Sequence, residues 1–245
     1  MNAPLYDAIG IDYARLRRPD PRIAARIDTA LGRARTVVNV GAGAGSYEPA
    51  HRDVTAVEPS REMIAQRSAD AAPAVRAGAE ALPFDDDAFD AAMAVLTVHH
   101  WSDRAAGLRE MARVARGPVV VLSVDPAHGG FWLYDYFPGL AALDAATMPG
   151  TEVFGAVLKR CRIETVPVPH DCVDGFLAAW WRRPAAYLDE RVRRATSPFH
   201  LIDGVEEGVA RLERDLKTGR WHRRYGGLLT MEALDCGYRL IVARG

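Results

Sequence analysis

The chain has 245 residues, of which 49% are hydrophobic and 26% charged, the composition of a soluble globular protein with one full core. A formal net charge of −1 gives no reason to expect nucleic acid or an anionic membrane as a partner. No apolar run has membrane-spanning length, and the first residues lack the charged and apolar regions of a signal peptide. The three cysteines have no ligand-like spacing, so we expect reduced thiols, a cytoplasmic protein and no metal site.

Residues 6–18 hold two tyrosines and end in an arginine pair, Arg17 and Arg18, directly before a proline. The residues alone fit an amphipathic helix whose aromatic side chains pack inward and whose arginines face solvent. From Pro21 to Leu31, apolar residues recur at every fourth position and predict a helix. Gly32 follows as its C-terminal stop.

A β-branched run at residues 36–40 predicts a buried strand, and Gly41, Gly43 and Gly45 follow it. Glycines permit a tight turn and the close approach of a ligand to the backbone. Such a turn after the first strand of an α/β unit brings backbone N–H groups to the edge of the sheet. Glu58, at the tip of the next strand, offers a carboxylate that can bind both hydroxyls of a ribose. The turn therefore predicts a site for a nucleoside-type cofactor.

The spacing of these glycines distinguishes between nucleoside cofactors. A dinucleotide-binding turn has the pattern G-x-G-x-x-G and an acid about 20 residues later. Here the pattern is G-x-G-x-G and Glu58 comes earlier, which disfavours NAD as the cofactor.

Strands and helices alternate through the rest of the first half of the chain. The predicted strands are Asp53–Glu58, Ala74–Ala77, Phe89–Leu96 and Pro118–Val124, and the predicted helices follow Ser60 and Asp103. Both of these residues suit an N-cap, and the fourth strand is apolar throughout, as expected of a strand covered on both faces. This alternation predicts an α/β fold built on a mostly parallel sheet.

Two adjacent histidines, His99 and His100, lie in the loop that follows the fourth strand. Ligands of open α/β sheets bind beyond the carboxyl ends of the strands, so this loop overhangs the reactive centre. Asp125 ends the neighbouring fifth strand and should face the same pocket. Because imidazole is a reasonable base near neutral pH and a carboxylate can orient it, we predict His100 as the base and Asp125 as the residue that orients it. His99 is the alternative base. It is also open that one of the two histidines only forms a hydrogen bond within the loop or contacts the cofactor.

The second half of the chain is richer in aromatic and helical segments. Residues 131–137 form the most aromatic stretch, which fits either a helix buried against the sheet or a wall for a flat or apolar acceptor. Arg162–Pro169 and residues 235–242 are predicted as strands that pair in antiparallel fashion at the end of the sheet. The segments 127–160 and 173–230 are predicted to be helical insertions that cap the substrate side.

Five motifs occur in the order found in one enzyme family. They are the glycine turn with Glu58, then Ala79–Asp85, Phe89–Asp90, His99–Trp101 and Glu110–Val114. On these motifs the chain resembles the class I S-adenosylmethionine-dependent methyltransferases, in the small-molecule, type 11-like branch. The resemblance implies a doubly wound, seven-stranded, mostly parallel sheet of the Rossmann-like methyltransferase type, with a helical cap inserted between the last strands. It implies a single domain over residues 1–245, with an N-terminal lid and helix at 1–32 and a cofactor-binding core at 33–126.

The resemblance assigns S-adenosyl-L-methionine as the cofactor and implies roles for residues that would hold its methionine part. Tyr13 would shield the methionine moiety, and Arg18 would face its carboxylate, for which a guanidinium fork is suited. Asn39 stands where the family usually has an acid. Its amide oxygen can still accept a hydrogen bond from the ammonium group of the cofactor.

The family often has an acid near Gly78 that accepts a hydrogen bond from the adenine amino group, and this chain has none there. Met63 either lies against the adenine or belongs to the core, and the adenine edge would rely on the backbone of Ala79 and on Glu80. The cofactor-binding residues expected in all are Tyr13, Arg18, Asn39, Gly41, Ala42, Gly43, Glu58, Pro59, Met63, Ala79, Glu80, Leu96 and Thr97.

The predicted function is S-adenosylmethionine-dependent methyl transfer to oxygen or carbon of a small-molecule metabolite. Relatives that methylate amino groups of bases carry an Asn/Asp-Pro-Pro-aromatic motif after the fourth strand, whereas residues 97–101 here read Thr-Val-His-His-Trp. Two alternatives stay open: another reaction that uses the same cofactor, such as cyclisation or decarboxylation, and a non-catalytic accessory protein that binds it. We expect a monomer or a homodimer.

Overall fold

The computed structural model describes residues 17–244, and its first element is the helix predicted at this place. Helix α2 (Pro21–Leu31) begins after Asp20, whose side chain caps it, and ends at Gly32 with a φ of 61°. That left-handed conformation suits glycine. The apolar residues at every fourth position are buried and share a core with strands β1 and β5, so the face read from the sequence is the one that packs on the sheet.

Seven strands form one sheet in the order β3-β2-β1-β4-β5-β9-β6. Their bounds are Thr36–Val40 (β1), Asp53–Val57 (β2), Ala74–Val75 (β3), Ala91–Val95 (β4), Pro118–Val124 (β5), Arg162–Thr165 (β6) and Tyr238–Arg244 (β9). Strand β9 is antiparallel to both of its neighbours, and the other pairings are parallel. The prediction of a doubly wound, seven-stranded, mostly parallel sheet is confirmed.

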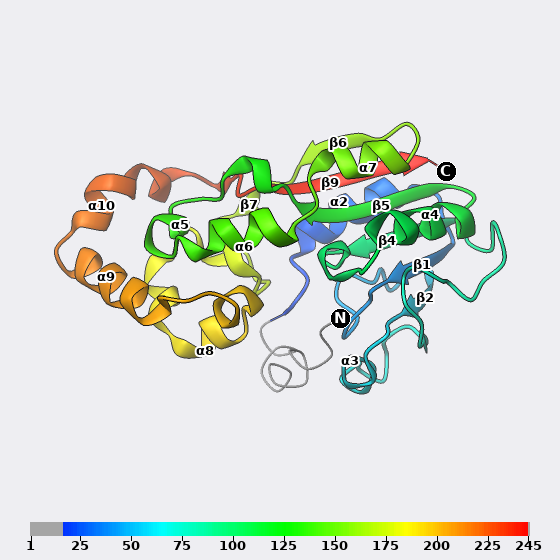
Figure 1. Ribbon diagram of the computed structural model, residues 1–245, viewed down its shortest axis with the longest axis horizontal. Coiled ribbons are helices and arrows are strands. Elements are labelled where there is room, and N and C mark those ends of the chain that lie inside the picture. The colour runs from blue at the N-terminus through cyan, green and yellow to red at the C-terminus, as the bar shows by residue number, and fades with distance from the viewer. Residues whose placement is uncertain (1–16, 245) are drawn as a thin grey trace.

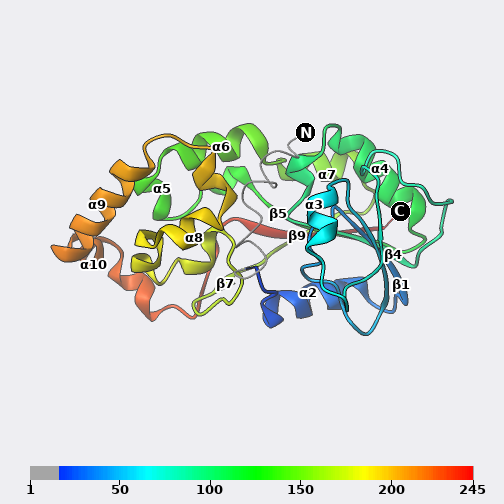
Figure 2. The same ribbon diagram turned by 90° about the horizontal axis from the view of Figure 1, so that it is seen from below.

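Helices cover both faces of this sheet, which is why its central strands are apolar throughout. Helix α2 packs on one face; α4 (Arg104–Val114) and α7 (Thr151–Val157) pack on the other, as Figure 2 shows. Strand residues alternate between the two cores: Val37 and Met93 face α2, whereas Val38 and Ala92 face α4. The short helix α3 (Arg61–Ala65) follows β2.

Five predicted strands have other bounds in the structure, and two of the differences have a clear local cause. Strand β2 ends at Val57, and β9 covers Tyr238–Arg244 rather than residues 235–242. Strand β4 stops at Val95 because Leu96 adopts a φ of 52°, which a β-strand does not allow. The segment predicted as one strand over Arg162–Pro169 divides into β6 and β7 (Val168–Pro169). Pro167 lies between them and has no N–H for the ladder. The third strand is shorter than predicted and covers Ala74–Val75.

The remaining helices gather at the end of the molecule away from β1 and β2 (Figure 1). They come from two stretches of chain, one between β5 and β6 and one between β7 and β8 (Ala233–Leu234). We call them together the helical cap. Its elements are η2 (Pro126–His128), α5 (Leu133–Tyr136), α6 (Gly139–Thr147), η3 (Leu177–Trp180), η4 (Pro184–Leu188), α8 (Glu190–Arg194), η5 (Ser197–His200), α9 (Val205–Lys217), α10 (Arg220–Tyr225) and η6 (Gly226–Thr230).

The cap has an aromatic core of its own. Trp132 stacks edge-to-face on Tyr187 and Trp221, with ring centroids 5.6 and 5.3 Å apart, a geometry that aromatic pairs favour. The aromatic residues at 131–137 serve two purposes. Trp132 and Phe137 are buried in this core, whereas Phe131 and Tyr134 line a cavity described below. Within residues 17–244, no helix combines the length and apolar character needed to cross a membrane.

Candidate functional site

A cavity of about 350 Å³ lies beyond the carboxyl ends of β1, β2 and β4. The strand order reverses between β1 and β4, and open α/β sheets bind ligands at such a point. We call it the first cavity. Its walls include Asn39, Gly41, Ala42, Gly43, Glu58, Pro59, Met63, Ala79, Glu80, Leu96, Thr97 and His100. Eleven of the thirteen predicted cofactor-binding residues are thus brought together around one space.

The glycine turn forms the wall next to β1 and admits no larger residue at its first position. Gly41 has a φ of 70°, and a Cβ there would lie 2.2 Å from Oγ1 of Thr97. Gly43 has a φ of 52° and faces the Met63 side chain at 3.2 Å from such a Cβ. Gly41 is required by conformation and by space and Gly43 by its conformation, and the backbone of the turn borders the cavity directly.

Glu58 ties the glycine turn to the start of helix α3. Its carboxylate is buried and accepts hydrogen bonds from the backbone N–H groups of Gly43, at 2.8 Å, and of Ser60, at 2.9 Å. Ser60 in turn caps α3. Each carboxylate oxygen has a second lone pair, so Glu58 holds the turn in place and can still accept hydrogen bonds from a ligand in the first cavity.

Asn39 presents an unused acceptor to the same space. Its side-chain nitrogen donates to Glu48 at 3.0 Å, whereas its buried oxygen has no hydrogen-bond partner among the described residues. A buried carbonyl oxygen without a donor is costly. A ligand in the first cavity that donates an N–H group to this oxygen would satisfy it.

Glu80 holds the opposite wall. Its Oε1 accepts hydrogen bonds from the N–H and the hydroxyl of Ser102, at 2.9 and 2.8 Å, and from Asp103 N at 3.2 Å. Burial alone would raise the pKa of this carboxyl, but these hydrogen bonds lower it overall. Glu80 is thus an ionised anchor for the loop that begins helix α4.

The loop after β4 carries the two histidines, of which His100 lines the first cavity. Leu96, at a φ of 52°, turns the chain away from the sheet; a non-glycine residue in this region costs about 1–3 kcal/mol and marks a constrained site. The imidazole rings of His99 and His100 lie 3.9 Å apart. Burial lowers the pKa of His100 to about 4, and burial together with nearby His100 lowers that of His99 well below its usual value. Both rings are therefore neutral at neutral pH.

A second cavity, of about 80 Å³, adjoins the first. Both cavities are lined by Arg17, Leu96 and His100. His99 lines only the second cavity. The other walls of the second cavity are mainly aromatic and aliphatic, and they include Val124, Phe131, Tyr134, Met148, Phe176, Leu177 and Tyr238.

The structure places Asp125 away from the two cavities that the histidines line. Asp125 lines neither cavity. Its carboxylate accepts a hydrogen bond from Ala127 N at 3.0 Å, as the N-cap of η2, and lies 3.9 Å from Nε of Arg239. Strand β5 does end beside β4, but the carboxylate is used to cap the turn that leads into the helical cap.

The N-terminal contact with the cavities comes from Arg17 rather than Arg18. Arg18 is exposed and lines neither cavity. Arg17 lines both, and its Nε lies 2.7 Å from Oδ1 of Asp174. The predicted lid residue Tyr13 lies outside the described residues.

Comparison with known proteins agrees with this architecture. A family model of the methyltransferase domain matches residues 38–121. A solved structure from Anabaena variabilis, described as a methyltransferase from an antibiotic biosynthesis pathway, is 33% identical in sequence. The match covers 95% of this chain and 100% of that one, with a TM-score of 0.86. This chain belongs to the class I S-adenosylmethionine-dependent methyltransferases.

Curated relatives match the methyltransferase over different lengths. An uncharacterized methyltransferase of Bacillus subtilis is 34% identical over 100 residues, 36% of this chain and 40% of that protein. The demethylmenaquinone methyltransferase of Mycolicibacterium vanbaalenii is 27% identical over 209 residues, 84% of this chain and 74% of that protein. The chain thus spans less than half the length of the Bacillus relative, and the acceptor must be argued from the site itself.

Sequence reasoning missed a buried ion pair behind the glycine turn of this methyltransferase. Arg67 and Glu48 lie 2.7 Å apart and are both buried. Arg67 also donates to the backbone oxygen of Gly43 at 3.0 Å, and Glu48 accepts from Asn39. The pair therefore supports both the turn and the asparagine from behind. An arginine just beyond α3 and a glutamate after the glycines carry no local signal of this pairing.

A second missed pair lies in the second cavity of the methyltransferase. The hydroxyl of Tyr134 donates a hydrogen bond to Oδ2 of Asp144, and both residues line the cavity. Asp144 is 6% exposed, and burial raises the pKa of its carboxyl. Asp144 is the one charged residue of helix α6, and an acid in an otherwise apolar helix is the signal that could have identified it.

Proposed function

We propose that this methyltransferase transfers the methyl group of S-adenosylmethionine to an oxygen or carbon atom of a small, flat aromatic acceptor. The observation that carries the proposal is the pair of adjoining cavities that share Arg17, Leu96 and His100. Methyl transfer from a sulfonium is an in-line displacement, which needs two ligands held end to end more than it needs a protein nucleophile. Two cavities with a common wall are suited to that task.

The first cavity would hold the cofactor through residues already placed around it. Asn39 would accept a hydrogen bond from the ammonium group at its unpartnered oxygen, and Glu58 would accept hydrogen bonds from the ribose hydroxyls. Met63 would lie against the adenine. When bound, S-adenosylmethionine supplies an electrophilic methyl group.

The second cavity would hold the acceptor. Its aromatic side chains, Phe131, Tyr134, Phe176 and Tyr238, offer faces and edges on which a flat ring can stack. Two relatives support the same class of acceptor, since one is a demethylmenaquinone methyltransferase and another a rice 2-methyl-6-phytyl-1,4-hydroquinone methyltransferase. Asp144 would accept a hydrogen bond from a hydroxyl group of the acceptor and fix the orientation of the ring.

His100 would receive the proton released at the acceptor. A neutral imidazole whose pKa is about 4 is too weak a base to ionise a phenol, whose pKa lies near 10, in the ground state. It can orient the hydroxyl by accepting its hydrogen bond. The acidity of that hydroxyl rises sharply as the oxygen acquires its new bond, so proton transfer to His100 becomes favourable late in the reaction. His99 would fill this role if the acceptor lies deeper in the second cavity.

The test is an incubation of the purified protein with S-adenosylmethionine and a panel of phenols, catechols and naphthohydroquinones, followed by mass spectrometry. We expect one class of acceptor to gain one methylene unit in mass while S-adenosylhomocysteine accumulates. A product without that gain, or release of methylthioadenosine, would indicate another reaction of the cofactor. Binding of S-adenosylhomocysteine with no turnover of any acceptor would favour an accessory role.

A further inference from the structure

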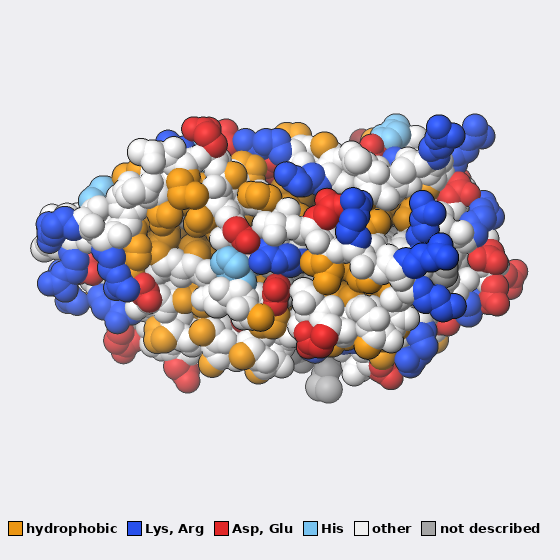
Figure 3. Space-filling model, turned by 90° about the horizontal axis from the view of Figure 1, so that it is seen from above, with side chains coloured by type: hydrophobic (Ala, Val, Ile, Leu, Met, Phe, Trp, Pro, Cys, Tyr) orange, Lys and Arg blue, Asp and Glu red, His pale blue; other side chains and the backbone are white. Residues whose placement is uncertain are grey.

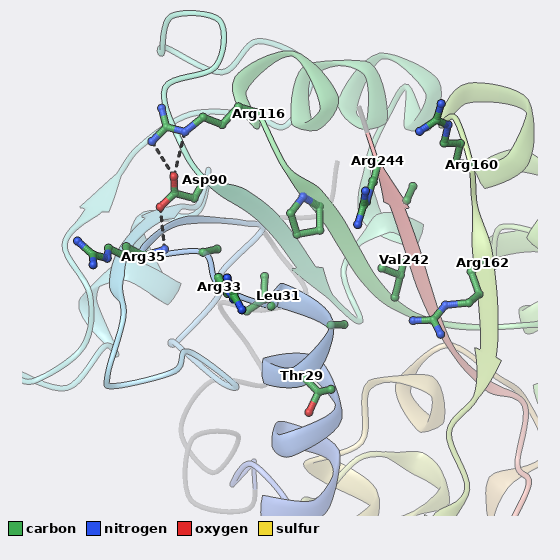
Figure 4. Close-up of a pocket in the computed structure, with 15 residues that line it drawn as sticks. Thr29, Leu31, Arg33, Arg35, Asp90, Arg116, Arg160, Arg162, Val242 and Arg244 are labelled. Carbon is green, nitrogen blue, oxygen red and sulfur yellow. Dashed lines mark hydrogen bonds and ion pairs between the residues drawn. The ribbon is translucent and has the colours of Figure 1, made fainter.

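A hollow of about 950 Å³ lies at the other end of the sheet from the first cavity. It is bordered by the C-terminus of α2 and the residues that precede β1, β4 and β5, together with β6 and the end of β9 (Figure 4). We call it the arginine groove. Strand β1 separates it from the glycine turn, and five residues at about 3.3 Å each put the two sites roughly 16 Å apart.

Six arginines from separate segments line this groove: Arg33, Arg35, Arg116, Arg160, Arg162 and Arg244. Asp90 is the only acidic residue among the described residues that line it. Figure 3 shows that basic side chains gather on the surface at the sheet end of the molecule and also at the end of the helical cap, although the chain as a whole carries a net charge of −1. The groove itself combines six arginines with one acid.

The single acid in the groove is fully engaged. One oxygen of Asp90 accepts hydrogen bonds from the backbone N–H groups of Arg35 and Thr36, at 2.7 and 3.0 Å. The other accepts two from the guanidinium of Arg116, at 2.9 and 2.7 Å. Asp90 therefore neutralises Arg116 and no other arginine.

Four guanidinium groups remain without an acid. Arg162 is paired with Glu164 at 2.8 Å, but Arg33, Arg35, Arg160 and Arg244 have no ion-pair partner among residues 17–244. Guanidinium groups stay charged at every physiological pH, and like charges gathered in one hollow repel one another. Among the described residues that line the groove, no acid offsets this repulsion for the four arginines. An anion bound between them would relieve it.

The floor of the groove is apolar. Leu31, Ala34, Pro118 and Val242 line the groove together with the arginines. In Figure 4 Val242 lies between Arg244, on the same strand β9, and Arg162, on the neighbouring strand β6. A flat apolar group can rest on such a floor while its charged substituents reach the rim. The volume falls within the range of small-ligand sites, about 300–1,000 Å³.

We propose that the arginine groove binds a nucleoside triphosphate or a closely similar polyphosphate ester. Guanidinium forks bind phosphate oxygens in bidentate fashion, and a triphosphate carries about four negative charges near neutral pH, which match the four unpaired arginines. The nucleobase would lie on the apolar floor. A small ligand is favoured over nucleic acid because the whole chain is not basic and carries a net charge of −1.

The test is calorimetric titration of the protein with ATP in 150 mM salt, with S-adenosylhomocysteine present at saturation. The second ligand keeps the adenosine of ATP out of the cofactor cavity, so heat reports the groove. We expect one site with a Kd below about 100 µM, and at least tenfold weaker binding in the double variant Arg33→Gln/Arg244→Gln. The matched control is Arg109→Gln/Arg214→Gln, which removes the same charge from exposed helix positions elsewhere, and it should bind ATP like the wild type. Unchanged affinity for S-adenosylhomocysteine in both variants shows that they are folded.

Each other outcome of this titration counts against the proposal. No saturable ATP binding would overturn it, as would an equal loss in the control variant, which would mean diffuse attraction. Tripolyphosphate binding as tightly as ATP would overturn the nucleoside part. Tighter binding of single-stranded RNA than of ATP, lost in Arg33→Gln/Arg244→Gln, would assign the groove to nucleic acid instead. The inference does not depend on the acceptor or on the methyl-transfer chemistry.

Discussion

The guanidinium of Arg17 and the carboxylate of Asp174 form a buried ion pair, with Nε and Oδ1 2.7 Å apart. The hydroxyl of Tyr47 donates to the other oxygen of Asp174 at 2.8 Å. One fully buried carboxylate thus joins the segment before α2, the loop after the glycine turn and the chain that follows β7. These three segments meet where the two cavities adjoin.

Replacement of Asp174 by asparagine should destabilise the protein. Arg17 and Tyr47 would lose the charged acceptor that they share, and removing one partner of a buried ion pair costs about 3 kcal/mol or more. Urea denaturation would measure the free energy of unfolding. The control is Asp171→Asn, which removes an exposed partner of Arg22 and should cost less than about 1 kcal/mol. Equal losses in the two variants would refute a special role for the buried pair.

Alanine at position 41 should abolish cofactor binding. Its Cβ would lie 2.2 Å from Thr97 Oγ1 at a φ of 70°, so the turn or the loop after β4 must move. We expect a loss of about 1–3 kcal/mol in stability and affinity for S-adenosylhomocysteine below detection by calorimetry. Gly227, which has open space around its Cβ position, serves as the control, and Gly227→Ala should leave affinity unchanged. Wild-type affinity in Gly41→Ala would show that the turn does not border the ligand.

The buried histidines should make the protein sensitive to mild acid. The folded-state pKa of His100 is about 4, below the unfolded value of about 6.5, so the unfolded state binds more protons between these pH values. Stability is then fully retained above pH 6.5 and falls as the pH drops toward 4, by up to about 3 kcal/mol for this residue. The measurement is the free energy of unfolding of wild type and His100→Asn from pH 8 to 4.5. The difference between them should change with pH; a constant difference would contradict the neutral, buried state of His100.

Replacement of Asp144 by asparagine should separate stability from turnover. Burial raises the pKa of the Asp144 carboxyl, so its ionised form carries a cost in the folded protein at neutral pH. Asp144→Asn should therefore be as stable as the wild type or more stable by about 1 kcal/mol, whereas KM for the acceptor should rise and affinity for S-adenosylhomocysteine should stay the same. If KM is unchanged, Asp144 does not contact the acceptor. Tyr134→Phe, which removes the hydroxyl that donates to Asp144, should also raise KM for the acceptor, by a smaller factor.

Most residues that line the first cavity could be predicted from the sequence, because each lies close in sequence to the end of a strand. The glycine turn, Glu58 and the loop after β4 each follow a strand directly, and a parallel sheet brings all carboxyl ends of its strands to one edge. The same rule did not predict the direction of the Asp125 side chain, since proximity of two strand ends does not fix where a side chain points. An N-cap interaction two residues along the chain determined its orientation.

The residues around the second cavity could not be predicted in this way. Tyr134, Asp144 and Asp174 come from stretches of the cap and its connections that have no common motif, and only the packed structure brings them to the cavities. Arg17 and Arg18 illustrate the limit at the scale of one residue. Both suit a carboxylate, but the direction of the chain before α2 turns Arg17 inward to Asp174 and leaves Arg18 in solvent.

The central claim is that Glu58 helps to hold an adenosyl cofactor in the first cavity, and calorimetry of S-adenosylhomocysteine binding to wild type, Glu58→Gln and Glu62→Gln tests it most directly. Hydrogen bonds to a charged group contribute about 1.5–3 kcal/mol, so Glu58→Gln should weaken binding by about 10- to 100-fold. Glu62→Gln, a substitution of an exposed glutamate in the first turn of α3, should bind like the wild type. Absence of binding to the wild-type protein, or equal affinities in all three, would contradict the account.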